Sequence, residues 1–324
     1  MVALSALALT ALKAAVKIDV RRQKQGNVFK EMIMEKGILV GVAVLLITGG
    51  MAQAQTQDIG LHGAVDVTYL SKYVWRGFDI YDDKSAIQPS VNLDLFGTGF
   101  GVGVMGHRAN SSGFENGERW DFNLYYSNRL FEGESYVTNY RLGWVLYNYP
   151  DQPTEGNVRV PWVVAPNASV QELHAILSWP KIFPAGIVPT YVLVKMWPTD
   201  SGSFSGSRSK ALTAAGIPGF GGTASGFAHI FMFDYSFPIE GLIPEIPEHM
   251  INLHTEAVFN DGVGPAGQNV DQDWSNVVFG ATTNIDLQDN LVLTPGVHHQ
   301  ITMDKSVNDD KDETWVTLSA MYKF

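Results

Sequence analysis

From residue 60 onward, apolar and polar side chains alternate along the chain with a period of two residues. In the first such segment Val65, Val67 and Tyr69 alternate with Asp66 and Thr68. Because successive side chains of a β-strand point to opposite faces, a segment of this kind has one apolar and one polar face. After residue 55 the sequence has neither a sustained helical period nor an apolar run long enough to span a membrane. The pattern therefore predicts an all-β fold.

The same alternation predicts twelve strands. They cover residues 60–76, 86–96, 99–108, 119–130, 135–148, 169–179, 187–197, 226–237, 249–260, 273–287, 290–303 and 312–324. An even number of antiparallel strands places both chain ends on the same side of a barrel.

The connections between these strands alternate in length. Short ones fall at 97–98, 132–134, 181–186, 239–248 and 288–289, and long ones at 77–85, 109–118, 149–168, 198–225, 261–272 and 304–311. Periplasmic turns and extracellular loops produce this alternation in bacterial barrels. We therefore predict a transmembrane antiparallel up-and-down β-barrel of about twelve strands. A soluble sandwich also alternates, but its loops need not separate by parity.

The last predicted strand, 312–324, ends on an aromatic residue. Its outward side chains are apolar, and Tyr322 and Phe324 lie on that same face. A final strand with this ending resembles the signal that the outer-membrane assembly machinery recognises. We predict that Tyr322 and Phe324 form this assembly signal and that the barrel assembly machinery is a partner.

The N-terminal part differs in composition from the rest. Residues 34–54 have a charged start, an apolar run at 38–47 and a small-residue cleavage site ending at Ala54. This arrangement predicts a secretory signal peptide, and the run is too short to span a bilayer. For residues 1–33 we predict an over-extended reading frame, with an amphipathic leader as the alternative. Either interpretation leaves 55–324 as the barrel.

The charge of the predicted barrel is strongly negative. The first 54 residues hold seven basic and three acidic side chains, which leaves 15 basic and 30 acidic side chains for the remainder, a net charge of −15. Nucleic acid is therefore not an expected partner, because binding it requires a basic surface. The chain has no cysteine, which excludes disulfides, thiolate zinc sites and a cysteine nucleophile.

If the polar strand faces point into the barrel, twelve ionisable side chains line the lumen. They are Asp66, Lys72, Arg76, Asp94, Arg129, Arg141, Glu172, His174, Lys195, Asp234, His254 and Glu256. Both signs are present, so these side chains could set up a transverse field that orients small polar solutes. Alternatively, they pair across the lumen and fill it. For Arg76 we expect a pair with Asp79, Asp82 or Asp83 that holds the first loop.

No cofactor is predicted. The acidic residues Asp309, Asp310, Asp312, Glu313, Asp261, Asp271 and Asp273 could bind divalent cations, but they lack the spacing of an EF-hand loop. A solvated acidic surface is the expected interpretation. His298 and His299 face opposite ways on a strand, so they cannot share one metal ion in the lumen. His254 and Glu256 share a face, and the sequence fixes no further ligand for them.

No nucleophile motif stands out either. The glycine and serine runs at 201–207 and 219–226 are typical of a flexible loop and not of a phosphate loop or a nucleophile elbow. We therefore predict a protein that is not an enzyme, and keep a barrel-embedded hydrolase as a less favoured alternative.

The stretch Tyr69 to Leu95 resembles the opening motif of the TorF-like porin (Gcw_chp) family of bacterial outer-membrane proteins. The resemblance rests on Tyr73-Val74-Trp75-Arg76-Gly77 and Ala86-Ile87-Gln88-Pro89. It covers about 27 residues strongly, and the long connection 198–225 departs from the family pattern. The resemblance implies a barrel with a porin role and indicates no substrate.

Together these features predict an integral protein of the bacterial outer membrane that acts as a porin-like channel for passive diffusion of small ions or polar solutes. Its expected partners are outer-membrane lipid and lipopolysaccharide, and a homo-oligomer is compatible with the sequence. The alternative is a structural or adhesive outer-membrane barrel without an open pore.

Overall fold

The computed structural model describes residues 60–151, 169–199, 226–243, 246–262, 270, 272–288, 290–305 and 307–324. All of them belong to one compact unit, Asp58–Phe324. The predicted leader and signal peptide lie outside the described residues. Within the described ranges, no helix is long and apolar enough to cross a membrane.

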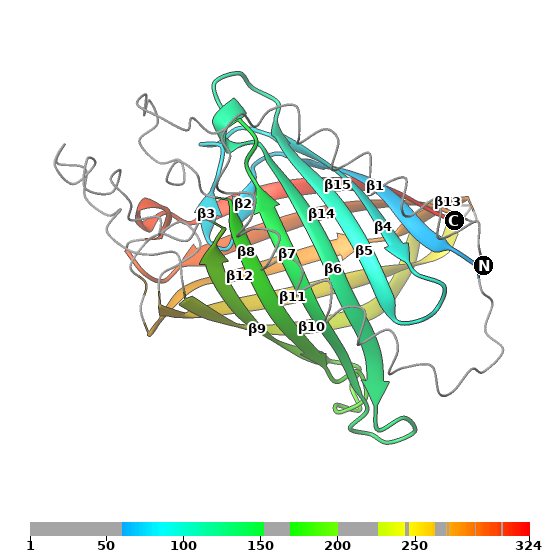
Figure 1. The fold of residues 1–324 in the computed structure, drawn as a ribbon. Helices are drawn as coiled ribbons and strands as arrows, with labels where there is room; N and C mark the ends of the chain where they lie inside the picture. Colours follow the sequence, from blue (N-terminus) through cyan, green and yellow to red (C-terminus); the bar gives the residue numbers. More distant parts are fainter. Residues whose placement is uncertain are drawn as a thin grey trace, which may run out of the picture. The chain divides into compact units, whose positions relative to one another are not determined.

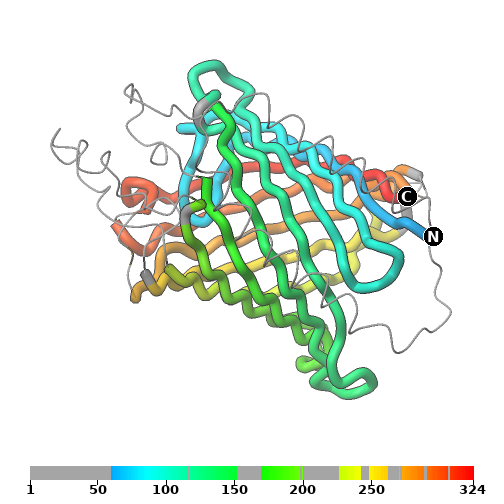
Figure 2. The backbone as a smooth tube through the Cα atoms, viewed as in Figure 1, coloured from blue at the N-terminus to red at the C-terminus, as the bar shows by residue number. Residues whose placement is uncertain are grey.

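Strands make up nearly all of the regular structure (Figures 1 and 2). The strands of the large sheet are β1 (His62–Leu70), β4 (Ala86–Asp94), β5 (Phe100–Ala109), β6 (Arg119–Leu130), β7 (Thr138–Asn148), β8 (Val170–Ser178), β9 (Val188–Pro198), β10 (Gly226–Ile243), β11 (Ile246–Gly262), β12 (Asp273–Thr283), β13 (Ile285–Gln288), β14 (Leu291–Thr302) and β15 (Glu313–Lys323). Two further short strands are β2 (Val74–Trp75) and β3 (Phe78–Asp79), and two 3-10 turns are η1 (Glu115–Gly117) and η2 (Asn308–Asp310).

The large sheet closes on itself. Each strand pairs antiparallel with its neighbours in sequence, and β1 pairs with both β4 and β15. β12 and β13 both pair with β14, so they are two segments of one strand interrupted at Asn284. The predicted antiparallel barrel of twelve strands is therefore confirmed. Closure pairs the first strand, β1, with the last, β15, and so removes the free edges that an open sheet would expose to lipid.

The strand boundaries differ from the predicted ones in two places. The first strand ends at Leu70 instead of residue 76, because residues 71–85 turn away from the sheet and form β2 and β3. The predicted turn 239–248 is mostly strand, since β10 and β11 pair as far as Ile243 and Ile246. The longest predicted connections, 149–168 and 198–225, lie mainly outside the described residues.

The outer face of the barrel is apolar. On β1 the side chains of Val65, Val67 and Tyr69 are 41%, 46% and 42% exposed, whereas the intervening Asp66 and Thr68 point inward and contact each other. The same parity continues on the final strand, where Val316, Leu318 and Tyr322 are exposed. Exposing an apolar band of this kind to water is unfavourable, whereas contact with lipid stabilises it.

Candidate functional site: a hairpin inside the barrel

Residues 71–85, called the hairpin below, connect β1 to β4 at the end of the barrel opposite to the C-terminus (Figure 1). β2 and β3 pair through Val74 with Asp79 and Trp75 with Phe78. The two residues between them have positive φ, 48° at Arg76 and 97° at Gly77. A two-residue turn of this type requires positive φ at both positions, which explains the glycine.

Arg76 points across the lumen to β8. Its guanidinium donates a hydrogen bond of 2.6 Å to Glu172 Oε2 and lies 3.0 Å from the Met196 sulfur. Glu172 also accepts hydrogen bonds from the Tyr147 hydroxyl at 2.7 Å and interacts with His174 at 3.1 Å. Both ion-pair partners are largely buried, and a buried charge requires a partner with satisfied hydrogen bonds.

This contact corrects the predicted pairing of Arg76 with Asp79, Asp82 or Asp83. The type of turn at Arg76 and Gly77 directs the guanidinium toward the opposite wall and away from the acidic residues of its own loop. Arg76 therefore joins the hairpin to β8.

Trp75 contacts two guanidinium groups. The ring centroid is 5.3 Å from the Arg76 Cζ and 4.2 Å from the Arg119 Cζ. Arg119 is only 3% exposed; it donates hydrogen bonds to Asp121 at 3.0 Å and to the Tyr73 hydroxyl at 2.8 Å. Cation–π contacts strengthen when the cation is desolvated, so this arrangement fixes the hairpin against β6 and β7.

The other side of the turn contacts β12 and β14. Gln300 Nε2 donates a hydrogen bond of 2.8 Å to the Gly77 carbonyl oxygen. A Cβ at Gly77 would lie 2.9 Å from Asn276 Oδ1 and 2.9 Å from Val307 Cγ1. In the ring of twelve strands, four strands separate β8 from β14 on one side and six on the other. The hairpin thus crosses the lumen.

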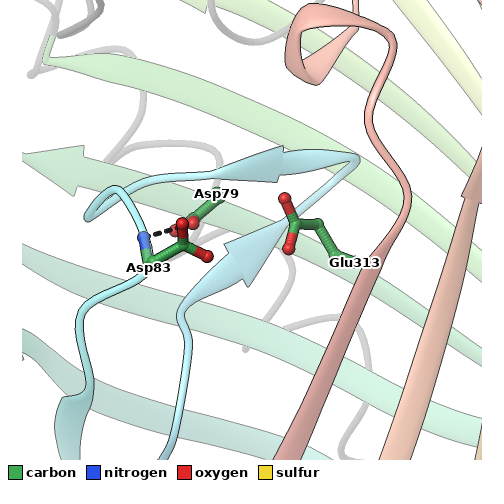
Figure 3. Close-up of side chains that lie close together, drawn as sticks. All are labelled: Asp79, Asp83 and Glu313. Carbon is green, nitrogen blue, oxygen red and sulfur yellow. Dashed lines mark hydrogen bonds between the residues drawn. The ribbon is translucent and has the colours of Figure 1, made fainter.

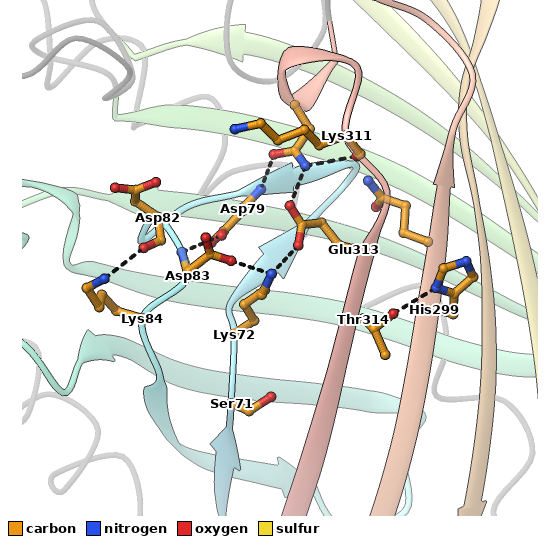
Figure 4. Close-up of polar contacts among 12 residues, drawn as sticks. Ser71, Lys72, Asp79, Asp82, Asp83, Lys84, His299, Lys311, Glu313 and Thr314 are labelled. Atoms are coloured by element: carbon orange, nitrogen blue, oxygen red, sulfur yellow. Dashed lines mark hydrogen bonds and ion pairs between the residues drawn. The ribbon is translucent and has the colours of Figure 1, made fainter.

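Three carboxylates gather where the hairpin meets β15 (Figure 3). The ligand atoms of Asp79, Asp83 and Glu313 lie within 4.8 Å of one another. The Lys72 ammonium forms ion pairs with Asp83 and Glu313 (Figure 4). Carboxylates at this separation suit a divalent cation, but here the lysine supplies the positive charge. Among the predicted acidic loop residues, Glu313 lies against the hairpin.

Charge and burial shift the pKa values in this cluster. Burial raises the pKa of Asp79 to about 6, although two backbone N–H groups donate to its carboxylate. The ion pair with Lys72 lowers the pKa of Asp83. Burial opposes the charge of Lys72, yet its two carboxylate partners raise the pKa of Lys72 above its ordinary value. The lysine therefore stays charged.

Strand register places most of the predicted lumen residues on the inner face. They are Asp66, Asp94, Arg129, Arg141, Glu172, His174, Asp234, His254 and Glu256. Their contacts are separate: Asp66 accepts from Ser319, Asp234 contacts His254 at 2.7 Å, and Arg141 donates to Ser127 at 2.9 Å. They do not form a single site, and their role in lining a pore stays a prediction.

The prediction for Lys195 is wrong. Lys195 pairs with Leu173 and Phe227 on the outer face, and its Nζ lies 4.4 Å from the centroid of the Phe227 ring. The physical reason is that the inner face of β9 is apolar. Val192, Val194 and Met196 are buried there in a cluster that also contacts Trp75 of the hairpin.

Sequence reasoning missed Arg119, Asn276 and Gln300, which contact the hairpin from the wall. The sequence Arg119-Trp120-Asp121 offered one signal, because it places two opposite charges on the same strand face with an aromatic residue between them. Asn276 and Gln300 carry no comparable local pattern.

Comparison with known proteins gives a match to one family model. Residues 46–183 match the model of Gcw_chp. It is described as a bacterial protein of unknown function (Gcw_chp), and the match confirms the predicted resemblance over less than half of the chain. The Gcw_chp match includes β1 to β8 and the hairpin and ends before β9. The description does not include the TorF-like name, which stays a prediction.

Several solved structures resemble the chain at low identity. The KdgM porin is 9% identical with a TM-score of 0.44, covering 81% of this chain and 99% of that one. The NanC porin is 8% identical with a TM-score of 0.45, covering 81% and 100%. The COG4313 outer membrane channel from Pseudomonas putida F1 is 12% identical with a TM-score of 0.45, covering 84% and 98%. A comparison with curated proteins gives no match.

The location follows from the chain's own architecture. A closed antiparallel barrel forms its backbone hydrogen bonds within its own sheet. The apolar side chains of its outer band face the surrounding lipid. In a chain that matches a bacterial family, this is the architecture of an outer-membrane protein. The predicted outer-membrane location is confirmed.

Proposed function

We propose that this barrel is a channel for the passive diffusion of small ions or polar solutes across the outer membrane. The observation that carries the proposal is the polar inner face, where Asp66, Asp234, His254 and Glu256 point inward. A barrel filled only for stability would bury apolar side chains there, because removing charges from water is costly even when they are paired.

The charges inside the barrel also differ from one side to the other. Arg129 and Arg141 lie on β6 and β7, and carboxylates at Asp66, Asp234 and Glu256 lie on β1, β10 and β11. Rings and rows of charged side chains set selectivity in membrane pores. With a net charge of −15 on residues 55–324, we expect the channel to prefer cations.

Conductance measurements test this proposal. The purified chain in planar bilayers should give discrete conductance steps, and the reversal potential in a KCl gradient should show cation preference. Glu256→Gln should reduce this preference. Glu132→Gln is the matched control, because it removes the same charge from an exposed residue of the turn between β6 and β7. The absence of conductance in every salt condition would contradict the proposal.

A structural barrel without an open path is the second candidate, since the hairpin crosses the lumen. A hydrolase has less support. His107, His174 and His254 each contact a carboxylate, but within the described residues none of these three contacts a serine or threonine hydroxyl. They therefore lack the nucleophile of a Ser-His-Asp arrangement.

A further inference from the structure

We infer that residues Trp75–Phe78, called the tip below, are a gate that the Arg76–Glu172 ion pair holds inside the lumen. The inference rests on the proposed function, because it concerns how conduction through the same barrel is regulated. It also requires that the remainder of the hairpin, called the root, stays in place when the tip moves.

The root is anchored like a protein core. Tyr81 is completely buried, and its hydroxyl donates to the carbonyl oxygens of His107 at 3.0 Å and Gly117 at 3.2 Å. Tyr73 is also buried, and its ring stacks on His107 with 5.0 Å between centroids. Large aromatic side chains with satisfied hydroxyls contribute strongly to stability, so the root is the fixed part of the hairpin.

The tip is held differently. Its backbone pairs within the hairpin, and within the described residues no backbone group of the tip bonds to the backbone of the barrel wall. Side chains make the attachment. Arg76 contacts Glu172 on β8, and Gln300 on β14 donates to the Gly77 carbonyl. Trp75 packs under the Arg119 guanidinium of β6, and the Phe78 ring is buried against Val270 and Val307. A segment outside the backbone ladder can move without breaking the sheet.

One feature opposes the seated position of the tip. Asn276 and Gln300, which contact Gly77, are fully buried, and their Nδ2 and Oε1 atoms have no hydrogen-bond partner. Burial of unsatisfied polar atoms is unfavourable. Withdrawal of the tip would let water reach both amides.

The Arg76–Glu172 ion pair opposes this cost. It joins a cation of the tip to a carboxylate of the wall, and its 2.6 Å length indicates a charge-assisted hydrogen bond. Loss of a hydrogen bond to a charged group shifts an equilibrium by about tenfold to a hundredfold. Removing the Glu172 charge while keeping the side chain's shape should therefore move the tip toward the withdrawn position.

A cysteine probe measures this movement directly, because the chain has no cysteine of its own. Asn276→Cys places a thiol under the tip, where the seated tip protects it from a small water-soluble methanethiosulfonate reagent. Ser112→Cys, in an exposed loop, gives the unprotected rate. The probe is combined with Glu172→Gln, and in a second variant with Arg76→Gln, which removes the same ion pair from the other side.

Arg108→Met is the matched control, because Arg108 is 77% exposed and forms its ion pair with Glu118 away from the hairpin. Each variant is first shown to be folded by its altered migration in unheated SDS gels. We expect Glu172→Gln and Arg76→Gln to raise the labelling rate of Asn276→Cys about tenfold or more and to increase the open fraction in planar bilayers. Arg108→Met should change neither quantity.

The outcomes separate this inference from the proposed function. Channels that conduct while the labelling rate stays equal in wild type and both ion-pair variants would overturn the gate and leave the channel intact. Faster labelling with no conductance in any variant would overturn the channel, and the gate with it. Faster labelling together with a larger open fraction would support both.

Discussion

The outer face of the barrel and the space around the hairpin follow different rules. On the outer face, every second side chain meets the same lipid environment, so alternation alone determines which residues are apolar. Inside, polar residues line much of the wall, but the wall is apolar at Val192 and Val194 on β9, where it contacts Trp75, and charged at Glu172 on β8, where it contacts Arg76. The uniform lipid environment produces a sequence pattern from which the outer face can be predicted, whereas the local contacts of the hairpin leave no such pattern in the sequence.

The largest expected effect concerns the interior. Arg119→Met leaves the Asp121 carboxylate in a buried position without its cation, and we expect a loss of about 3–5 kcal/mol of unfolding free energy. The double variant with Asp121→Asn should recover part of that loss. Urea unfolding of the refolded barrel in detergent measures both. If Arg119→Met costs no more than Arg108→Met, the aromatic and ionic contacts of Arg119 do not stabilise the barrel.

The outer face is tested by a pair of neighbouring substitutions on β1. Val67→Lys places an ammonium in the apolar band and should destabilise the barrel by about 2–4 kcal/mol if the site lies near the bilayer midplane. Thr68→Lys places the same charge inside, beside Asp66, and should cost much less. Equilibrium unfolding in lipid vesicles compares them. Equal costs would mean that β1 does not face lipid at Val67.

These contrasts explain how much could be predicted. The twelve strands and their pairing in sequence order followed from alternation and connection length. The inward position of Glu172 and Glu256 followed from the same alternation. Each of these features depends on one strand and its immediate neighbours.

The hairpin depends on contacts between distant parts of the chain and was not predicted. Its alternation resembles a continuation of the first strand, and nothing near Arg76 in sequence indicates a partner 96 residues away on β8. Lys195 was misplaced for the same reason, since the apolar inner face of β9 is set by the hairpin. Local patterns carry no information about which segment enters the lumen.

A smaller effect separates backbone strain from packing at the tip. Gly77 and Gly113 both have a φ of 97°, but a Cβ at Gly77 meets Asn276 and Val307 at 2.9 Å, whereas a Cβ at Gly113 has open space around it. Gly113→Ala should cost about 1–2 kcal/mol from strain alone. Gly77→Ala should cost roughly 1–3 kcal/mol more from overpacking. Urea midpoints of the two variants give the difference, and equal midpoints would show that the contact is not tight.

The smallest expected effect is a pH dependence from Asp79. Burial raises the pKa of Asp79 from 3.8 to about 6, so ionising it is harder in the folded barrel than in the unfolded chain. Its contribution to stability is therefore complete below pH 3.8 and is lost as the pH rises through about 6. Solvent screening and the nearby charges of Lys72, Asp83 and Glu313 reduce the expected change to about 1 kcal/mol. Asp79→Asn should abolish this component of the urea midpoint between pH 4 and pH 7. If the urea midpoints of wild type and Asp79→Asn differ by the same amount at every pH, the pKa of Asp79 is not raised. Water would then reach the carboxylate more than its burial implies.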